Sequence, residues 1–265
     1  MPKFAANLTM LFSEIDFLYR FEAAARCGFT GVEYLFPYGY EKDRLVEALE
    51  TYNLNQVLHN LPAGDWAAGD RGIACDPNRT GEFQDGVGKA LDYARALKCA
   101  QLNCLAGKVP PNVTLDQAHR TFVENVTFAS RALAANRINL LIEAVNTWDV
   151  PGFFLNQTAQ ALSIIDEAGC GNLLLQYDIY HMQIMEGNLA TTMAKNLSRI
   201  AHIQVADVPG RHEPGTGEIN YPFLFGFLDR ADYTGWIGCE YNPASTTEKG
   251  LGWLNSHQSQ AAQSA

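Results

Sequence analysis

Four short apolar runs in the second half of the chain each end in a polar side chain that can hold a cation or a proton. They are INLLIEAVN with Glu143, NLLLQYDIYH with Asp178, IAHIQVAD with Gln204 and GWIGCEYNP with Glu240. A carboxylate at the end of a buried strand is costly unless a metal, a hydrogen-bond network or a proton stabilises it. Three such carboxylates therefore predict one shared site.

The spacing of these four positions constrains the fold. They are separated by 35, 26 and 36 residues, and each interval holds a strand, a crossover helix and the next strand. That repeat is typical of a (β/α)8 TIM barrel, which occupies about 250 residues and carries its active site at the carboxyl ends of its strands. We therefore expect a single α/β domain over residues 1–256, followed by a flexible polar tail at 257–265.

The rest of the chain fits this repeat, with eight expected strands that alternate with helices. A doubly wound sheet is the alternative, but no GxGxxG motif follows the first strand. Residues 61–77, rich in Gly and Ala, are too long for an ordinary turn and are expected to form a lid-type insertion. Expected strands are 3–8, 31–36, 55–60, 101–107, 138–143, 172–178, 200–207 and 235–240, and expected helices are 14–27, 41–52, 80–97, 114–135, 158–169, 189–197 and 222–231.

Charge and cysteine usage exclude several classes of protein. The formal net charge of −10 argues against binding along a nucleic-acid backbone, which needs clustered Lys and Arg. The six cysteines are dispersed without a CxxC pair, as in reduced cytosolic proteins. No export leader and no apolar stretch of about 18 residues is seen, so we expect a cytoplasmic protein without a membrane span. Homo-oligomerisation is left open.

The four polar strand ends suggest a metal-assisted reaction. Glu143, Asp178, Gln204 and Glu240 offer hard oxygen ligands, which suit Mg²⁺ or Mn²⁺ better than zinc. Taken singly, each carboxylate could instead be a buried salt-bridge partner. Glu143 and Glu240 belong to strands on opposite sides of the barrel mouth, so one could remove a proton from a substrate and the other could return it. Which of them acts first is open, because it depends on their surroundings.

Four further side chains are candidates for binding the substrate. His181 follows Asp178 in the turn after the sixth strand, and His59 ends the third strand. Lys108 and Arg211 lie in loops on the catalytic rim, where either could bind a substrate carboxylate. His202, two residues before Gln204, is expected to be a satisfied core histidine.

Several long segments resemble a known family. FAANLTMLFSE, GVEYLFPYGY, LHNLPAGDWAAGDRGIAC, QYDIYHMQIMEGNL, EPGTGEINYPFLF and GWIGCEYNP are similar to the hydroxypyruvate isomerase group of the xylose isomerase-like TIM barrels, up to about residue 255. The resemblance implies interconversion of hydroxypyruvate and 2-hydroxy-3-oxopropanoate (tartronate semialdehyde) in glyoxylate metabolism. It also implies that Glu143 and Glu240 transfer the proton and that, with Asp178 and Gln204, they surround the metal.

Other functions on the same barrel would require different features of the site. A 2-oxo-tetronate isomerase or a ketose 3-epimerase would share both glutamates and have a wider pocket. A DNA-repair endonuclease would need about three metals, many His ligands and a basic groove, which the charge and the six histidines disfavour. A non-catalytic sugar-binding barrel would not need two opposed glutamates.

Overall fold

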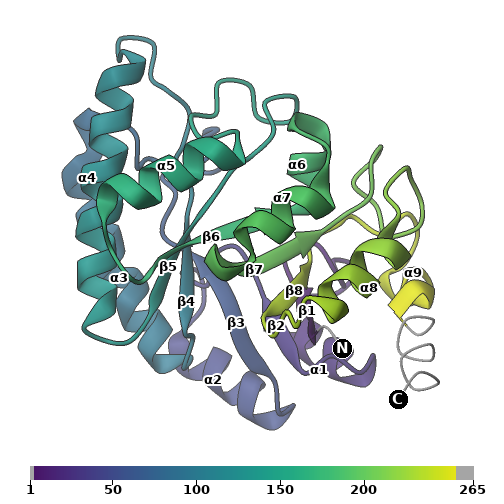
Figure 1. Ribbon diagram of the computed structural model, residues 1–265. Helices are drawn as coiled ribbons and strands as arrows, with labels where there is room; N and C mark the ends of the chain where they lie inside the picture. Colours follow the sequence, from purple (N-terminus) through teal and green to yellow (C-terminus); the bar gives the residue numbers. More distant parts are fainter. Residues whose placement is uncertain (1–2, 255–265) are drawn as a thin grey trace.

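Eight parallel strands close into a barrel in the computed structural model, which describes residues 3–254 (Figure 1). Consecutive strands pair with each other, and the first pairs with the last to complete the ring. This confirms the predicted (β/α)8 barrel. The expected tail at 257–265 lies outside the described residues. The strands are β1 (Lys3–Asn7), β2 (Gly31–Glu33), β3 (Asn55–Asn60), β4 (Gln101–Cys104), β5 (Asn139–Glu143), β6 (Leu173–Asp178), β7 (Ile200–Val205) and β8 (Trp236–Cys239).

Helices form a layer around the barrel and cover its outer wall (Figure 1). Their inward faces join the strands in a large apolar core. Besides the expected crossover helices, the structure contains α6 and α9 and three short 3₁₀ segments. The helices are α1 (Arg20–Arg26), α2 (Lys42–Thr51), α3 (Thr80–Ala96), α4 (Leu115–Ala134), α5 (Thr158–Ala168), α6 (Ile179–Met185), α7 (Leu189–Asn196), α8 (Tyr221–Arg230) and α9 (Thr247–Gly250), with 3₁₀ segments at Phe17–Tyr19, Pro77–Arg79 and Leu197–Arg199.

Local sequence signals explain most helix ends. The Thr114 side chain accepts a hydrogen bond from the Gln117 backbone N–H, and the Gln117 side chain accepts one from the Thr114 backbone N–H, so α4 begins with a capping box close to its expected start. Gly169 ends α5 at the expected position, and its backbone adopts the left-handed conformation. The expected helix start at Glu14 is wrong. The Glu14 carboxylate instead accepts a hydrogen bond from the Thr247 backbone, at 2.6 Å, and the helical segment begins only at Phe17.

The barrel interior has an apolar base and a polar layer above it. Ala5, Val57, Leu58 and Leu141 form the small cluster at the base. The polar layer contains Glu33, His202, Gln204, Gln176 and Asn7, all of which are buried. Polar side chains inside a barrel must satisfy one another, since no water reaches them in bulk.

Glu33 is the centre of the polar layer. One of its carboxylate oxygens accepts hydrogen bonds from Asn7 (3.0 Å) and Gln204 (2.7 Å), and the other lies 2.7 Å from His202 Nε2. This confirms His202 as a core residue. A Cβ atom at Gly238 would lie 2.3 Å from the Glu33 carboxylate, so the absence of a side chain on β8 makes room for this buried acid.

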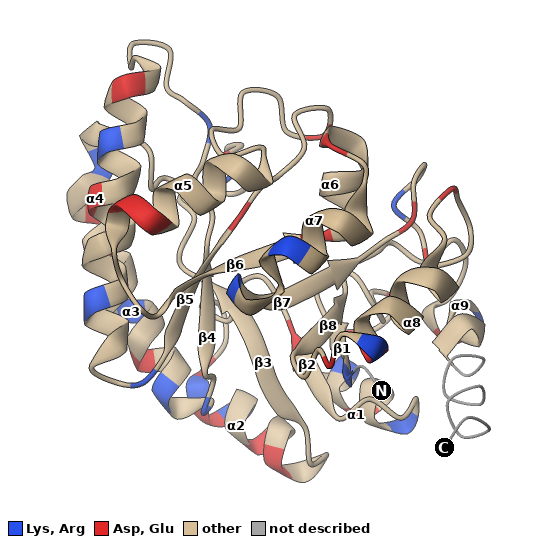
Figure 2. Cartoon of the chain, in the orientation of Figure 1, with Lys and Arg blue, Asp and Glu red and all other residues tan. Residues whose placement is uncertain are grey.

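Two properties of the described exterior are its helix hydrophobicity and its charge distribution (Figure 2). No helix within residues 3–254 is both long and apolar enough to cross a bilayer. Basic residues are interspersed with acidic ones over the outer helices (Figure 2). All six cysteines are free thiols.

Candidate active site

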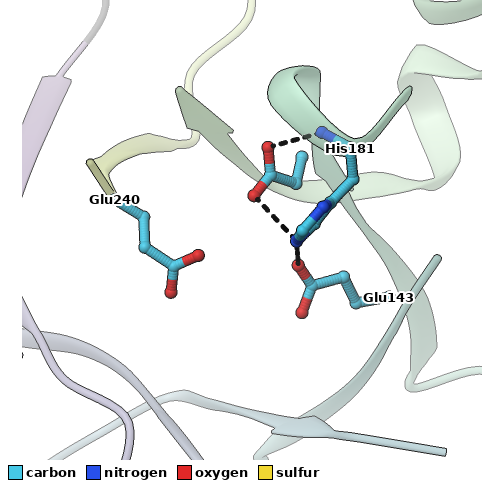
Figure 3. Close-up of side chains that lie close together, drawn as sticks. Glu143, His181 and Glu240 are labelled. Carbon is cyan, nitrogen blue, oxygen red and sulfur yellow. Dashed lines mark hydrogen bonds and ion pairs between the residues drawn. The ribbon is translucent and has the colours of Figure 1, made fainter. Parts of the chain in front are cut away.

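Four side chains gather at the carboxyl end of the barrel, and three of them are the carboxylates expected at the strand ends. Each of Glu143, Asp178, His181 and Glu240 offers an oxygen or nitrogen atom that lies within 4.8 Å of the corresponding atoms of the other three. Figure 3 shows Glu240 facing Glu143 and His181 across a common centre. The two glutamates therefore meet at one opening and can contact the same small molecule.

The strand ends fix the two carboxylates on the β5–β6 side. Glu143 is the last residue of β5, and one of its oxygens accepts a hydrogen bond of 2.9 Å from Asn103 on β4. Asp178 ends β6 and caps α6, since its Oδ1 accepts hydrogen bonds from the backbone N–H groups of Tyr180 and His181. Its Oδ2 is buried and accepts no hydrogen bond from the described residues. A buried acceptor left in this state is suited to an additional ligand.

The hydrogen bonds around His181 determine which ring nitrogen carries the proton. Asn146 Nδ2 lies 2.7 Å from His181 Nδ1 and can only donate, while Asn146 Oδ1 accepts from the Trp148 and Asp149 backbones. Nδ1 is therefore the acceptor, and Nε2 carries the hydrogen. Nε2 lies 3.7 Å from Asp178 and 3.9 Å from Glu143. Burial and the Arg211 charge lower the pKa of His181, so the ring is neutral and presents an N–H donor to the site.

Glu240 follows β8 and is held from two sides. Its Oε1 accepts a hydrogen bond from Asn7 at 3.1 Å, and its Oε2 lies 2.5 Å from Arg211 Nη2. Arg211 also lies 3.9 Å from Asp178, and its guanidinium stands over the Tyr180 ring at 5.0 Å. The loop after β7 thus brings one cation to the edge of the acidic cluster.

The cluster holds more negative charge than this cation can balance. Burial, followed by the charges of Glu240 and Asp178, raises the pKa of Glu143 well above its usual range. Burial also raises the pKa of Asp178, and it raises that of Glu240 to about 8, although Arg211 opposes both changes. Three hard carboxylates, one of which keeps a buried oxygen that accepts no hydrogen bond from the described residues, fit a divalent cation, which would restore the balance of charge.

A cavity of about 250 Å³ opens onto the cluster. Glu143, His181, Arg211 and Glu240 line one part of it, and Asn60, Trp66 and Arg71 line another. The pocket is small and encloses both acidic and basic groups. Such a pocket suits a small molecule with polar groups.

The structure brings together most of the side chains singled out in the sequence. Glu143, Asp178, His181, Arg211 and Glu240 share the site, although His181 lies in the first turn of α6 and not in a turn as expected. Gln204 lies in the polar layer, where its Oε1 accepts a hydrogen bond of 2.6 Å from Gln176 and its Nε2 donates to Glu33.

The other two candidates do not line this cavity. His59 contacts Tyr38 and the Asn60 carbonyl, while its neighbour Asn60 is the residue of β3 that lines the cavity. Side chains alternate across a strand, so the two neighbours point to opposite sides. Lys108 donates to the Gly69 carbonyl at 3.2 Å and is not a lining residue.

Sequence reasoning missed several asparagines and one arginine. Asn7 and Asn103 support the two glutamates, and Asn146 orients His181. Asn7 ends β1, and Asn103 is the penultimate residue of β4, so polar residues at the ends of the first four strands were a signal for them. Arg71 belongs to an irregular segment that gives no periodic signal.

Comparison with known proteins places the chain in a family. Residues 21–257 match the xylose isomerase-like TIM barrel family. Hydroxypyruvate isomerase of Escherichia coli (strain K12) is 55% identical over 97% of this chain and 100% of the relative. A 2-oxo-tetronate isomerase of Cupriavidus necator is 46% identical, covering 96% of this chain and 98% of the relative.

A solved structure agrees with this placement. The crystal structure of an AP endonuclease, family 2, from Brucella melitensis has a TM-score of 0.94 and 44% sequence identity, and the match covers 97% of this chain and 99% of that one. Together with the two isomerases, it matches the barrel over almost its whole length. The chain belongs to the xylose isomerase-like TIM barrel family, in the group that contains hydroxypyruvate isomerase and 2-oxo-tetronate isomerase.

Proposed function

We propose that this protein is a hydroxypyruvate isomerase, an intramolecular oxidoreductase that interconverts hydroxypyruvate and 2-hydroxy-3-oxopropanoate. The observation that carries the proposal is the placement of Glu143 and Glu240 on opposite sides of one small cavity. The 55% identity to the E. coli enzyme of that name supports the same substrate. The corresponding place in metabolism is glyoxylate metabolism. We infer a cytoplasmic location from the six free cysteines.

The reaction moves one carbon-bound proton and one oxygen-bound proton. A carboxylate removes a proton from C3 of hydroxypyruvate, and the C3–C2 bond becomes the double bond of an enediolate as the C2 carbonyl takes up the electron pair. A proton is then returned to C2, while the proton of the C3 hydroxyl passes to the C2 oxygen, so that C3 becomes the aldehyde and C2 carries the new hydroxyl group. Glu143 and Glu240 face the cavity from two sides and are assigned to these transfers.

The surroundings of the two glutamates suit an acid–base pair. Their raised pKa values let the cluster hold a proton near neutral pH while another carboxyl is ionised. The Nε2–H group of His181 is placed to donate a hydrogen bond to a substrate oxygen on which negative charge develops. Arg211 holds Glu240 in position through their 2.5 Å contact.

The donor set also fits a divalent cation. Glu143, Asp178, Gln204 and Glu240 are proposed to hold Mg²⁺ or Mn²⁺; the clustering of the three carboxylates, and the Oδ2 of Asp178 that accepts no hydrogen bond within residues 3–254, support the proposal, while Gln204 would have to release its Oε1 from Gln176 to join them. When bound, such an ion would polarise the carbonyl and hydroxyl oxygens of the substrate. His181, with its hydrogen on Nε2, is assigned to the substrate and not to the ion.

Two alternatives follow from the relatives. A 2-oxo-tetronate isomerase or a ketose 3-epimerase would use the same glutamates on a longer substrate, and the small cavity favours the three-carbon acid. Endonuclease activity, which the name of the Brucella protein includes, would need a basic surface. The net charge of −10 and the interspersed charges in Figure 2 favour a small-molecule substrate over nucleic acid.

The test is to incubate the purified protein with hydroxypyruvate in D₂O and to follow the product by NMR. Formation of 2-hydroxy-3-oxopropanoate with deuterium at C2 is expected, because the carboxyl that returns the proton to C2 exchanges its own proton with solvent during the lifetime of the enediolate. Parallel incubation with a four-carbon 2-oxo acid and with a ketose separates the alternatives. Absence of product from hydroxypyruvate, with turnover of one of the others, would replace the proposed substrate.

A further inference from the structure

We propose that Arg71 binds the carboxylate of the substrate and thereby selects a 2-oxo acid over a neutral sugar. This inference rests on the proposed function, because it assigns the recognition of the acid group within the same site. Arg71 takes this role in place of Lys108 and Arg211, the two cations that the sequence predicts to bind a substrate carboxylate.

Two arginines reach the cavity, and Lys108 does not. Arg71 and Arg211 are its two basic lining residues among the described part of the chain. Lys108 is held away, since its Nζ donates to the Gly69 carbonyl at 3.2 Å. A carboxylate bound in the cavity could therefore pair with the guanidinium group of either arginine.

Arg211 already contacts two acidic side chains of the cluster. Its Nη2 lies 2.5 Å from Glu240 and 3.9 Å from Asp178. A substrate carboxylate placed against Arg211 would lie next to both of these acidic groups, and like charges at such distances repel strongly in a buried site. Arg211 therefore serves the acidic cluster and is poorly suited to the acid group of the substrate.

Arg71 carries no such partner. Its Nη1 donates to the backbone carbonyls of Trp66 (3.2 Å) and Asp70 (2.6 Å), and no ion pair with an acidic side chain forms in residues 3–254. The nearby Asp70 carboxylate is bound by Arg79 at 2.7 Å and by the Asp65 backbone. Arg71 Nε and Nη2 remain free to donate within the described structure, and this edge of a guanidinium matches a carboxylate in a bidentate geometry.

The segment that carries Arg71 is fixed in place. Gly72 and Gly107 meet backbone to backbone, since a Cβ atom on Gly107 would lie 2.3 Å from the Gly72 carbonyl oxygen. A backbone bridge joins Gly72 to Ala106. The guanidinium of Arg71 also stands over the ring of Trp66 at 4.2 Å. A cation held in this way loses little conformational entropy when it binds an anion.

The experiment compares wild type with Arg71→Met and Arg71→Lys, using Arg44→Met on the exposed face of α2 as the matched control. Each protein is assayed with hydroxypyruvate and with dihydroxyacetone, in which a neutral CH₂OH replaces the carboxylate. We expect Arg71→Met to raise KM for hydroxypyruvate by about 10- to 100-fold, as for the loss of a charge-assisted hydrogen bond. The kcat/KM for dihydroxyacetone should change by less than about twofold, and Arg71→Lys should recover part of the loss.

A binding measurement keeps this test independent of turnover. Glycerate is a three-carbon acid that cannot be isomerised by this reaction, and glycerol is its neutral counterpart. Calorimetric titration should show that Arg71→Met weakens glycerate binding by about 10- to 100-fold while Arg44→Met does not change it. Unchanged KM and glycerate binding in Arg71→Met, or equal losses for dihydroxyacetone, would overturn the assignment. Failure of wild type to isomerise hydroxypyruvate would contradict the proposed function, and the glycerate result would still decide the role of Arg71.

Discussion

Replacing Glu240 by Gln should make the metal-free protein more stable at alkaline pH. Burial raises the pKa of Glu240 from 4.5 to about 8, although Arg211 opposes the change. An acid with a raised pKa in the folded state contributes stability below its unfolded pKa, and this contribution is lost as the pH rises through the folded value. Glutamine has the same shape and cannot ionise, so the variant does not suffer this loss.

The size of the effect follows from the pKa change. A rise from 4.5 to about 8 corresponds to about 5 kcal/mol of folding free energy once the carboxyl is ionised. Water entry and relaxation of the cluster reduce such penalties, so we expect a measured difference of about 2–4 kcal/mol. The difference between variant and wild type should be near its minimum at pH 5 and should grow between pH 5 and 9.

Urea unfolding in the presence of EDTA, repeated at one-unit steps from pH 5 to 9, measures this difference. Glu124→Gln, on the exposed face of α4, is the control and should show no comparable pH dependence. Saturating Mg²⁺ should reduce the advantage of the Glu240→Gln variant at pH 8, because the ion stabilises the fully ionised cluster of wild type more than a cluster that lacks one carboxylate. A free-energy difference that stays flat with pH, or a variant that is less stable than wild type at pH 9, would refute the reasoning.

Three further predictions test the site. Glu143→Gln should lower kcat by at least ~10²-fold with the thermal unfolding midpoint unchanged or raised, as for loss of a proton-transfer group, and near-normal turnover would remove Glu143 from the mechanism. Dialysis against EDTA should abolish isomerisation, and Mg²⁺ or Mn²⁺ should restore it; activity that survives in verified metal-free enzyme would contradict the metal assignment. Asn146→Asp should lower kcat by about 10-fold or more, because an acceptor at this position moves the hydrogen of His181 from Nε2 to Nδ1, whereas Mg²⁺ affinity measured by calorimetry should change little.

The features that could be predicted from sequence are those set by periodic patterns. Alternating strands and helices, with polar residues where the strands end, predicted the barrel and the meeting of Glu143 with Glu240. Parallel strands in a closed ring place all their carboxyl ends at one mouth. This geometry needs no knowledge of individual side-chain contacts.

The features that could not be predicted depend on local geometry. Asp178 ends a strand and caps α6 at the same time, so no loop separates the two elements and His181 falls in a helix. On β3, a shift of one residue decides that Asn60 and not His59 lines the cavity. Arg71 stands on an irregular segment whose course is set by contacts between glycine backbones, and such contacts leave no periodic signal in the sequence.

The contact between Gly72 and Gly107 has a consequence for how substrate preference changes within this family. The segment around Gly72 lines the pocket and is joined to the loop after β4 by backbone contacts. We expect these contacts to keep the segment from moving outward, so access to the pocket depends on the side chains that the segment carries. New substrate preferences would then arise by substitution of residues on this segment, such as Trp66 or Arg71, without a change in its backbone conformation. Substitution of Gly72 or Gly107 by a bulkier residue would displace the whole segment that carries these side chains.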